Sequence, residues 1–248
     1  MLGLSRCFLL SSLKRPMVQY CCLVQPLLFL LLFTQATSLT GEALFWFIAL
    51  HAPFACGWGI LVFTSISDID RDRMVGTFAY LKITPLGYVA ILLSRTLVNT
   101  MLAYLSGILL LAVGLGGGVI ALPVMNGFPW LVLGWWTLVW LLVGWFSLLL
   151  AVFITKYDEG RILMNFVNFP IVIVSAFGFS SFYLPDALAW LSVVFPHALL
   201  LELLRERVGL VSVLDKLDVA VLPVFVMSSV MMLVATVYFL RKSIHELN

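Results

Sequence analysis

The sequence predicts an all-α polytopic membrane protein with six transmembrane helices, and three observations carry this prediction. Hydrophobic residues make up 63% of the 248 residues, whereas charged residues make up only 10%. The mean hydropathy is +1.13. So little polar surface cannot cover a soluble globule, and several apolar stretches can cross a hydrocarbon core of about 30 Å as helices. A single membrane domain is therefore expected over residues 1–248.

The predicted spans follow from the apolar stretches. They are residues 17–38, 43–66, 86–115, 128–154, 162–183 and 219–240. Residues 1–16 mix basic residues with leucines, which predicts a helix lying in the membrane interface. A rival interpretation is a cleaved secretory signal, because a basic start, an apolar core and the pair Ala36 and Ser38 resemble such a signal.

Residues 184–218 are expected to form an outer hairpin and loop before the last span. Their apolar run, 187–201, is fifteen residues long and contains Pro196. A helix of that length reaches about 22 Å, short of the bilayer core, which predicts a re-entrant or interfacial hairpin. The alternative is a seventh span that would place the C-terminus outside. The charged residues that follow are expected to form a solvated patch: Glu202, Arg205, Glu206, Arg207, Asp215, Lys216 and Asp218.

The distribution of basic residues supports this topology. With both termini in the cytoplasm, ten Lys and Arg residues lie inside and three outside, which fits the positive-inside bias. The inner ten are Arg6, Lys14, Arg15, Arg71, Arg73, Lys82, Lys156, Arg161, Arg241 and Lys242. Arg95 falls within a span, close enough to its inner end to snorkel. A multi-pass protein of the plasma (inner) membrane is predicted, and the net charge of +2 gives no reason to expect nucleic acid as a partner.

A charged segment, residues 67–87, separates the second and third spans. Its first half alternates aspartate and arginine over 68–73. Placing such a cluster in hydrocarbon would cost several kcal/mol. The segment is therefore expected to lie in water on the cytoplasmic side.

The second half of this segment predicts a short amphipathic helix over 73–83. Met74, Phe78 and Leu81 recur at spacings of four and three, which gives one apolar face. Pro85 ends the helix, because proline lacks an amide hydrogen and restricts the residue before it. Such a helix is suited to dock in a groove on another protein. The alternative is that its apolar face rests on lipid headgroups.

Several residues inside the spans are candidates for a cargo path or a dimer seam. His51 is ionisable and lies in an apolar run, which invites a proton-relay role, although a hydrogen-bonded packing role is the simpler interpretation. Ala103 and Gly107 form a small-x-x-x-small pair that permits close helix approach. The full candidate set is His51, Ala103, Gly107, Ser175 and Gly178.

The sequence offers few signals of chemistry on this chain. No G-x-x-x-x-G-K-[ST] phosphate loop occurs, so the chain cannot bind ATP by that route. Ser180 follows a glycine and could act with His197 as an intramembrane serine hydrolase, which would need a buried Ser–His pair. No metal site is predicted, and the cysteines are expected to be free, buried thiols: Cys7, Cys21, Cys22 and Cys56.

The order of these parts resembles the type-2 (ABC-2) exporter permeases of ATP-binding-cassette transporters over nearly the whole chain. That family typically carries an acidic residue, Gly-Thr, apolar positions and Thr-Pro after the second span. The matching residues here are Asp72, Gly76, Thr77, Phe78, Leu81, Thr84 and Pro85. A later and more specific match comprises Pro170, Ser175, Leu184, Pro185, Trp190, Pro196 and Arg205. Two departures, Ala79 and Ala176, stand where the family often has an acidic residue and a glycine.

The resemblance implies a permease subunit of an ATP-driven exporter, with no catalysis of its own, that moves a hydrophobic or amphipathic cargo outward. It implies a second permease half, identical or homologous, and two ATP-binding cassette subunits that carry ATP and Mg²⁺. The coupling helix that would bind those subunits comprises Asp72, Arg73, Met74, Gly76, Thr77, Phe78, Leu81, Thr84 and Pro85. The alternatives are the serine hydrolase and a non-transporting membrane receptor or immunity component.

Overall fold

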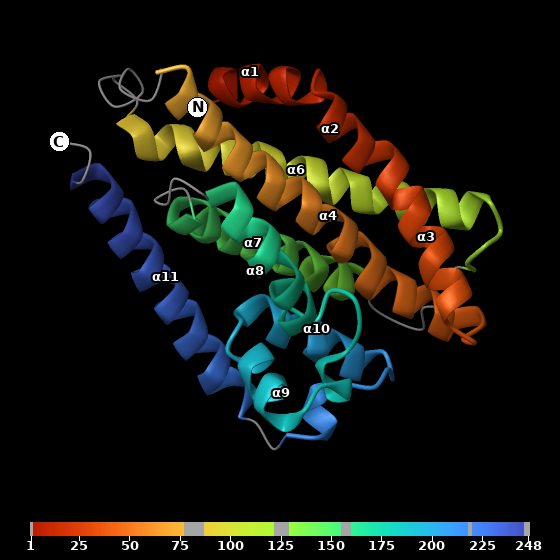
Figure 1. Cartoon of the computed structure of the whole chain (residues 1–248). Coiled ribbons are helices and arrows are strands. Elements are labelled where there is room, and N and C mark those ends of the chain that lie inside the picture. Colours follow the sequence, from red (N-terminus) through yellow and green to blue (C-terminus); the bar gives the residue numbers. More distant parts are fainter. Residues whose placement is uncertain (1, 77–86, 122–128, 155–159, 218–219, 246–248) are drawn as a thin grey trace.

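The structure, a computed structural model, describes residues 2–76, 87–121, 129–154, 160–217 and 220–245 (Figure 1). The regular structure of this part is entirely helical, so the all-α prediction is confirmed. Its longer helices are α1 (Leu2–Leu13), α3 (Gln25–Ala36), α4 (Gly41–Met74), α6 (Gly87–Gly116), α7 (Pro129–Ile154), α8 (Gly160–Val174), α10 (Pro196–Arg207) and α11 (Val221–His245). The shorter ones are α2 (Pro16–Gln19), η1 (Tyr20–Val24), η2 (Ser181–Tyr183), α9 (Asp186–Val193) and η3 (Val213–Asp215).

Four helices in the described residues are long and apolar enough to cross a membrane. Their apolar portions are Gly41–Asp72, Tyr88–Gly116, Leu133–Phe153 and Val221–Phe239. The pair α9 and α10 raises the number to five if it is one broken span, and Tyr20–Gln35 is a shorter apolar helix. The architecture is compatible with a multi-pass membrane protein, and the predicted number of six spans is reproduced only in part.

The predicted fifth span, 162–183, is not a continuous helix. α8 ends at Val174 and is only fifteen residues long. Ala176 then takes a left-handed backbone conformation with φ of 59°, which an α-helix of L-residues cannot continue. Residues 175–180 therefore turn the chain toward η2. The prediction of a single helical span over 162–183 was wrong.

The hairpin before the last helix is sharply bent. α9 and α10 meet at an angle of 104° immediately before Pro196. This confirms that residues 187–201 do not form one straight span. Figure 1 places the hairpin at the opposite end of the molecule from the C-terminal end of α4.

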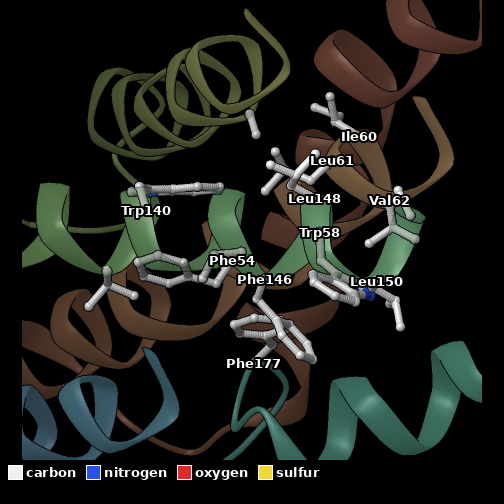
Figure 2. Packing of buried hydrophobic residues seen from close by; sticks show 14 of the residues in the cluster. Phe54, Trp58, Ile60, Leu61, Val62, Trp140, Phe146, Leu148, Leu150 and Phe177 are labelled. Carbon is white, nitrogen blue, oxygen red and sulfur yellow. The ribbon is translucent and has the colours of Figure 1, made fainter. Parts of the chain in front are cut away.

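Helix α4 is the centre of the core. In its most apolar 18-residue window 88% is buried within the chain, far more than the 17% of the corresponding window of α11. Figure 2 shows rings from α4 meeting rings from α7 and from the turn after α8: Phe54, Trp58, Trp140, Phe146 and Phe177. Because lipid tails are as apolar as these rings, their association depends on close van der Waals packing.

Small residues allow α4, α6 and α7 to approach closely. A Cβ atom added to Gly57 would lie 2.2 Å from the Trp140 ring and 3.2 Å from the Cβ of Ala103. A Cβ atom on Gly107 would lie 2.9 Å from the Cβ of Pro53. The small pair Ala103 and Gly107 therefore allows close packing against α4 and α7 within the chain, and its place at a dimer seam stays a prediction.

Candidate functional site

Two carboxylates lie one helical turn apart at the C-terminal end of α4. Asp68 and Asp72 are 4% and 6% exposed, although the sequence predicts that the charged segment lies in water. Asp68 accepts from Arg15 and lies 3.4 Å from the Nη2 atom of Arg71, and Asp72 accepts from Arg95. We call these five residues the α4-end cluster. The prediction that Asp68 and Asp72 lie in water was wrong, because Arg15, Arg71 and Arg95 neutralise their charges within the chain.

The α4-end cluster joins α4 and α6 to the link between α1 and α2. Arg15 precedes α2, both aspartates belong to α4, and Arg95 belongs to α6. The guanidinium of Arg95 also lies 4.8 Å from the centre of the Phe8 ring on α1, within the range of a cation–π interaction. Arg95 was expected to snorkel toward water, whereas its side chain is only 10% exposed and pairs inside the chain.

Polar pairs continue from this cluster along the antiparallel contact between α4 and α6. Asn99 Nδ2 donates to Ser65 Oγ at 3.4 Å. The Cys56 Sγ and Ser106 Oγ atoms lie 3.6 Å apart. Residue numbers in these pairs fall along α4 as they rise along α6, so polar contacts join the two antiparallel helices at several points along their length. Any force on the end of α4 is therefore shared with α6.

The structure describes four of the nine predicted partner-binding residues, which lie at or just after the end of α4. Asp72 lies in the α4-end cluster, while Arg73 and Met74 form the end of α4 rather than a separate helix. The side chain of Met74 is 70% exposed. Gly76 has a φ of 73°, a left-handed conformation that suits glycine and follows the helix end. Five predicted residues lie outside the described part of the chain: Thr77, Phe78, Leu81, Thr84 and Pro85.

His51 has the packing role that the sequence favours. Its ring is 2% exposed, its Nδ1 atom lies 2.7 Å from the carbonyl oxygen of Phe47, and the two rings are 4.4 Å apart. The hydrogen bond spans one turn of α4. His51 therefore lies in the core of the chain, and within the described residues its ring contacts Phe33 and Phe47 rather than an acidic side chain.

A second polar cluster lies inside the outer hairpin. Glu202 of α10 accepts hydrogen bonds from Ser180 Oγ at 2.9 Å, Ser181 N at 2.7 Å and Val213 N at 2.9 Å. Its carboxylate also forms an ion pair of 2.7 Å with Arg205. We call these five residues the hairpin cluster. Glu202 therefore ties α10 to the turn after α8 and to the loop before α11.

The hairpin cluster was not foreseen. The sequence predicts that Glu202 and Arg205 belong to a solvated patch, but their side chains are 1% and 0% exposed. Arg205 also donates to the carbonyl oxygen of Ala176. The signal that could have indicated burial is their i, i+3 spacing on a helix that is rich in leucine, most of it buried. The partners themselves come from distant segments, which no local pattern reveals.

The backbone of Ala176 is strained in the turn after α8. Its φ of 59° puts an L-residue in the left-handed region, and its carbonyl group is fixed by Arg205. Of the predicted residues beside it, Ser175 is fully buried, whereas a Cβ atom on Gly178 would meet open space. The turn is thus held by the hairpin cluster despite its unfavourable residue.

Replacing Ala176 by Gly is expected to raise the free energy of unfolding by up to about 1.5 kcal/mol. Glycine relieves about 1 to 2 kcal/mol of left-handed strain and gives back about 0.5 to 1 kcal/mol in chain entropy. Ala189→Gly is the matched control, because Ala189 is equally buried but helical, and it should destabilise. Thermal unfolding in detergent measures both. Equal destabilisation by the two variants would contradict the strain at position 176.

The arrangement required for a serine hydrolase is not formed. Ser180 Oγ donates to Glu202. Among the described residues neither ring nitrogen of His197 has a hydrogen-bond partner. The ring packs among three phenylalanines at 5.0 to 5.7 Å: Phe146, Phe177 and Phe195. A general base must lie within hydrogen-bonding distance of the nucleophile whose proton it accepts. The geometry therefore gives this alternative no support.

The described residues form neither a metal site nor a disulfide. They contain no group of three His, Cys, Asp or Glu side chains placed to hold a metal ion. All four cysteines are free, as predicted, but only Cys21 and Cys56 are buried, whereas Cys22 is half-buried and Cys7 is exposed. Comparison with known protein families, curated proteins and solved structures finds no match to this chain.

Proposed function

We propose that this chain is the membrane-spanning permease subunit of an ATP-driven ABC exporter. The proposal builds on the sequence resemblance and on the mechanical connection at the end of α4. In it, two permease halves associate with two ATP-binding cassette subunits, which carry ATP and Mg²⁺ on the cytoplasmic side. The chain itself contributes the path for a hydrophobic or amphipathic cargo and performs no hydrolysis.

The observation that carries the proposal is the ion pair between Asp72 and Arg95. These residues lie on either side of segment 77–86, where the sequence predicts the docking face of Phe78 and Leu81. A partner that pushes on this segment would act on the ends of α4 and α6 together. The buried polar pairs and the close packing at Gly57 and Gly107 support motion of the two helices as one body.

The proposed cycle follows from this connection. Closure of the cassette subunits on ATP moves the docked segment, and the joined α4–α6 pair transmits this displacement through the aromatic core to α7. The two permease halves then exchange an inward-open for an outward-open arrangement, which releases the cargo outside. ATP shifts the equilibrium only because it binds one arrangement more tightly than the other.

Replacing Phe78 and Leu81 by Asp is expected to abolish export while leaving membrane insertion intact. Burying such apolar side chains in a partner contributes about 1.5 to 3 kcal/mol each, and two carboxylates would remove this attraction. The matched control is V194D/V211D, which adds two charges at exposed positions of the opposite end. Cargo accumulation in inverted vesicles and ATPase of the complex are measured together.

The predicted outcome is loss of transport and of cargo-stimulated ATPase in F78D/L81D, with the control unchanged. Unchanged export by F78D/L81D would contradict the docking assignment. ATPase that cargo stimulates without any accumulation in vesicles would instead favour the non-transporting receptor. No observation in the described residues favours that second function over the first.

A further inference from the structure

A buried donor and a buried acceptor lie one turn apart on α6, and neither has a partner among the described residues. The donor is the Nε atom of Arg95, and the acceptor is the Oδ1 atom of Asn99. The Arg95 side chain is 10% exposed and Asn99 is 1% exposed. An unsatisfied buried polar group is costly, and nearly all such groups in folded proteins have a partner. A partner for these two atoms is therefore expected.

Neighbouring contacts hold the two side chains in place. Arg95 pairs with Asp72 through Nη1, and the Phe8 ring lies against its guanidinium. Asn99 Nδ2 donates to Ser65 Oγ on α4 at 3.4 Å. Because the Ser65 oxygen accepts this bond, its own hydroxyl proton is left to donate. The contact between α4 and α6 thus offers an N–H group, an O–H group and a carbonyl oxygen within one turn of α6.

The spacing of these groups suits a bridge through one small molecule. Positions 95 and 99 are separated by a rise of about 6 Å along α6. Two hydrogen bonds of about 2.8 Å each, made through one oxygen atom, span about 5 to 6 Å. The charges nearby favour a neutral bridge, because the Asp72 carboxylate repels an anion and the Arg95 guanidinium repels a cation. A molecule that both accepts and donates is required.

We infer that an ordered water molecule binds between Arg95 and Asn99 and completes the polar contact between α4 and α6. It accepts from Arg95 Nε–H and from the Ser65 hydroxyl, and it donates to Asn99 Oδ1. About three hydrogen bonds are usual for a buried water. The water connects the Asp72–Arg95 ion pair to the Ser65–Asn99 pair, so both act as one unit. The inference does not depend on the proposed export function.

The test is solid-state NMR of the full chain, labelled with ¹³C and ¹⁵N, in lipid bilayers. Magnetisation is passed from water protons to the arginine Nε–H groups, and the Arg95 signal is identified by its absence from R95K. The variant is N99L, which keeps similar size and removes the acceptor. S94A is the matched control, because the Ser94 hydroxyl lies beside Arg95 but donates to the Ala90 carbonyl oxygen at 2.8 Å.

The Arg95 signal of the parent and of S94A is expected to receive magnetisation from water. Loss of one hydrogen bond should lower the occupancy of the site about fivefold, so the transfer should fall by that factor in N99L. The distance between Arg95 Nε and Asn99 Cγ is measured in the parent alone, which keeps the test decisive if N99L does not fold. It should exceed about 5 Å, because two hydrogen bonds separate the side chains.

Three results would overturn the inference. The first is an Arg95 signal in the parent that receives no magnetisation from water. The second is a distance of about 4 Å between Arg95 Nε and Asn99 Cγ, which indicates a direct hydrogen bond. The third is equal transfer in N99L and S94A, which would place the water elsewhere. None of them bears on whether the chain exports a cargo, because the measurements involve no ATP.

Discussion

Replacing Arg205 by Met is expected to destabilise the protein by about 3 to 5 kcal/mol, because it leaves the buried carboxylate of Glu202 without its countercharge. The side chains of the pair are 0% and 1% exposed, so water cannot compensate. The loss should appear as a large drop in the thermal unfolding midpoint in detergent. Arg207→Met is the matched control, since Arg207 is exposed on the same helix, and it should change stability little.

A second variant separates loss of charge balance from loss of packing. In E202Q/R205M the glutamine carries no charge, and its single carbonyl oxygen can accept from either Ser181 N or Val213 N, which donate to different oxygens of Glu202. It should therefore recover part of the stability lost in R205M, because the uncompensated buried charge is gone. If R205M unfolds at the parent's temperature, or if the double variant is no better than R205M, the hairpin cluster does not hold the fold in the way described.

Exchanging the charges of Asp72 and Arg95 is the second change with a large expected effect. Each single reversal, D72R or R95D, places two like charges together at a site about nine-tenths buried. We expect each to cost about 3 to 5 kcal/mol and to abolish export. The double exchange D72R/R95D restores an opposite pair and should recover stability and transport in part. Unfolding midpoints and vesicle uptake measure the two properties.

The exposed pair Asp186 and Lys216 is the control for this exchange. Its atoms are 2.6 Å apart, but Asp186 is 76% exposed, and such surface pairs contribute about 0 to 1 kcal/mol. D186K/K216D and its single variants should therefore change little. Parent-like stability and export in D72R alone would mean that the α4–α6 connection carries no force.

The sequence predicted the parts of the fold that depend on local pattern. Apolar length predicted the helical character of the chain, and Pro196 marked the bend between α9 and α10. Small residues at 103 and 107 predicted close helix approach, although not that the approaching helices belong to the same chain. These features follow from the periodicity, breakers and residue size of short stretches.

The two polar clusters escaped prediction because their members are far apart in the chain. Asp72 was predicted to lie in water and Arg95 to extend toward it, but the two form a buried ion pair in which each neutralises the charge of the other. Glu202 was assigned to a solvated patch because charged neighbours follow it, but its partners come from positions 180, 181 and 213. Burial of a charge depends on tertiary partners, which one sequence does not reveal.

The subunit composition of the complex, purified in mild detergent from its native membrane, tests the central claim most directly. Mass spectrometry of that complex should reveal an ATP-binding cassette protein for each copy of this chain, and ATP hydrolysis should depend on that companion. A chain that exports its cargo in vesicles with no nucleotide-hydrolysing protein bound would contradict the account.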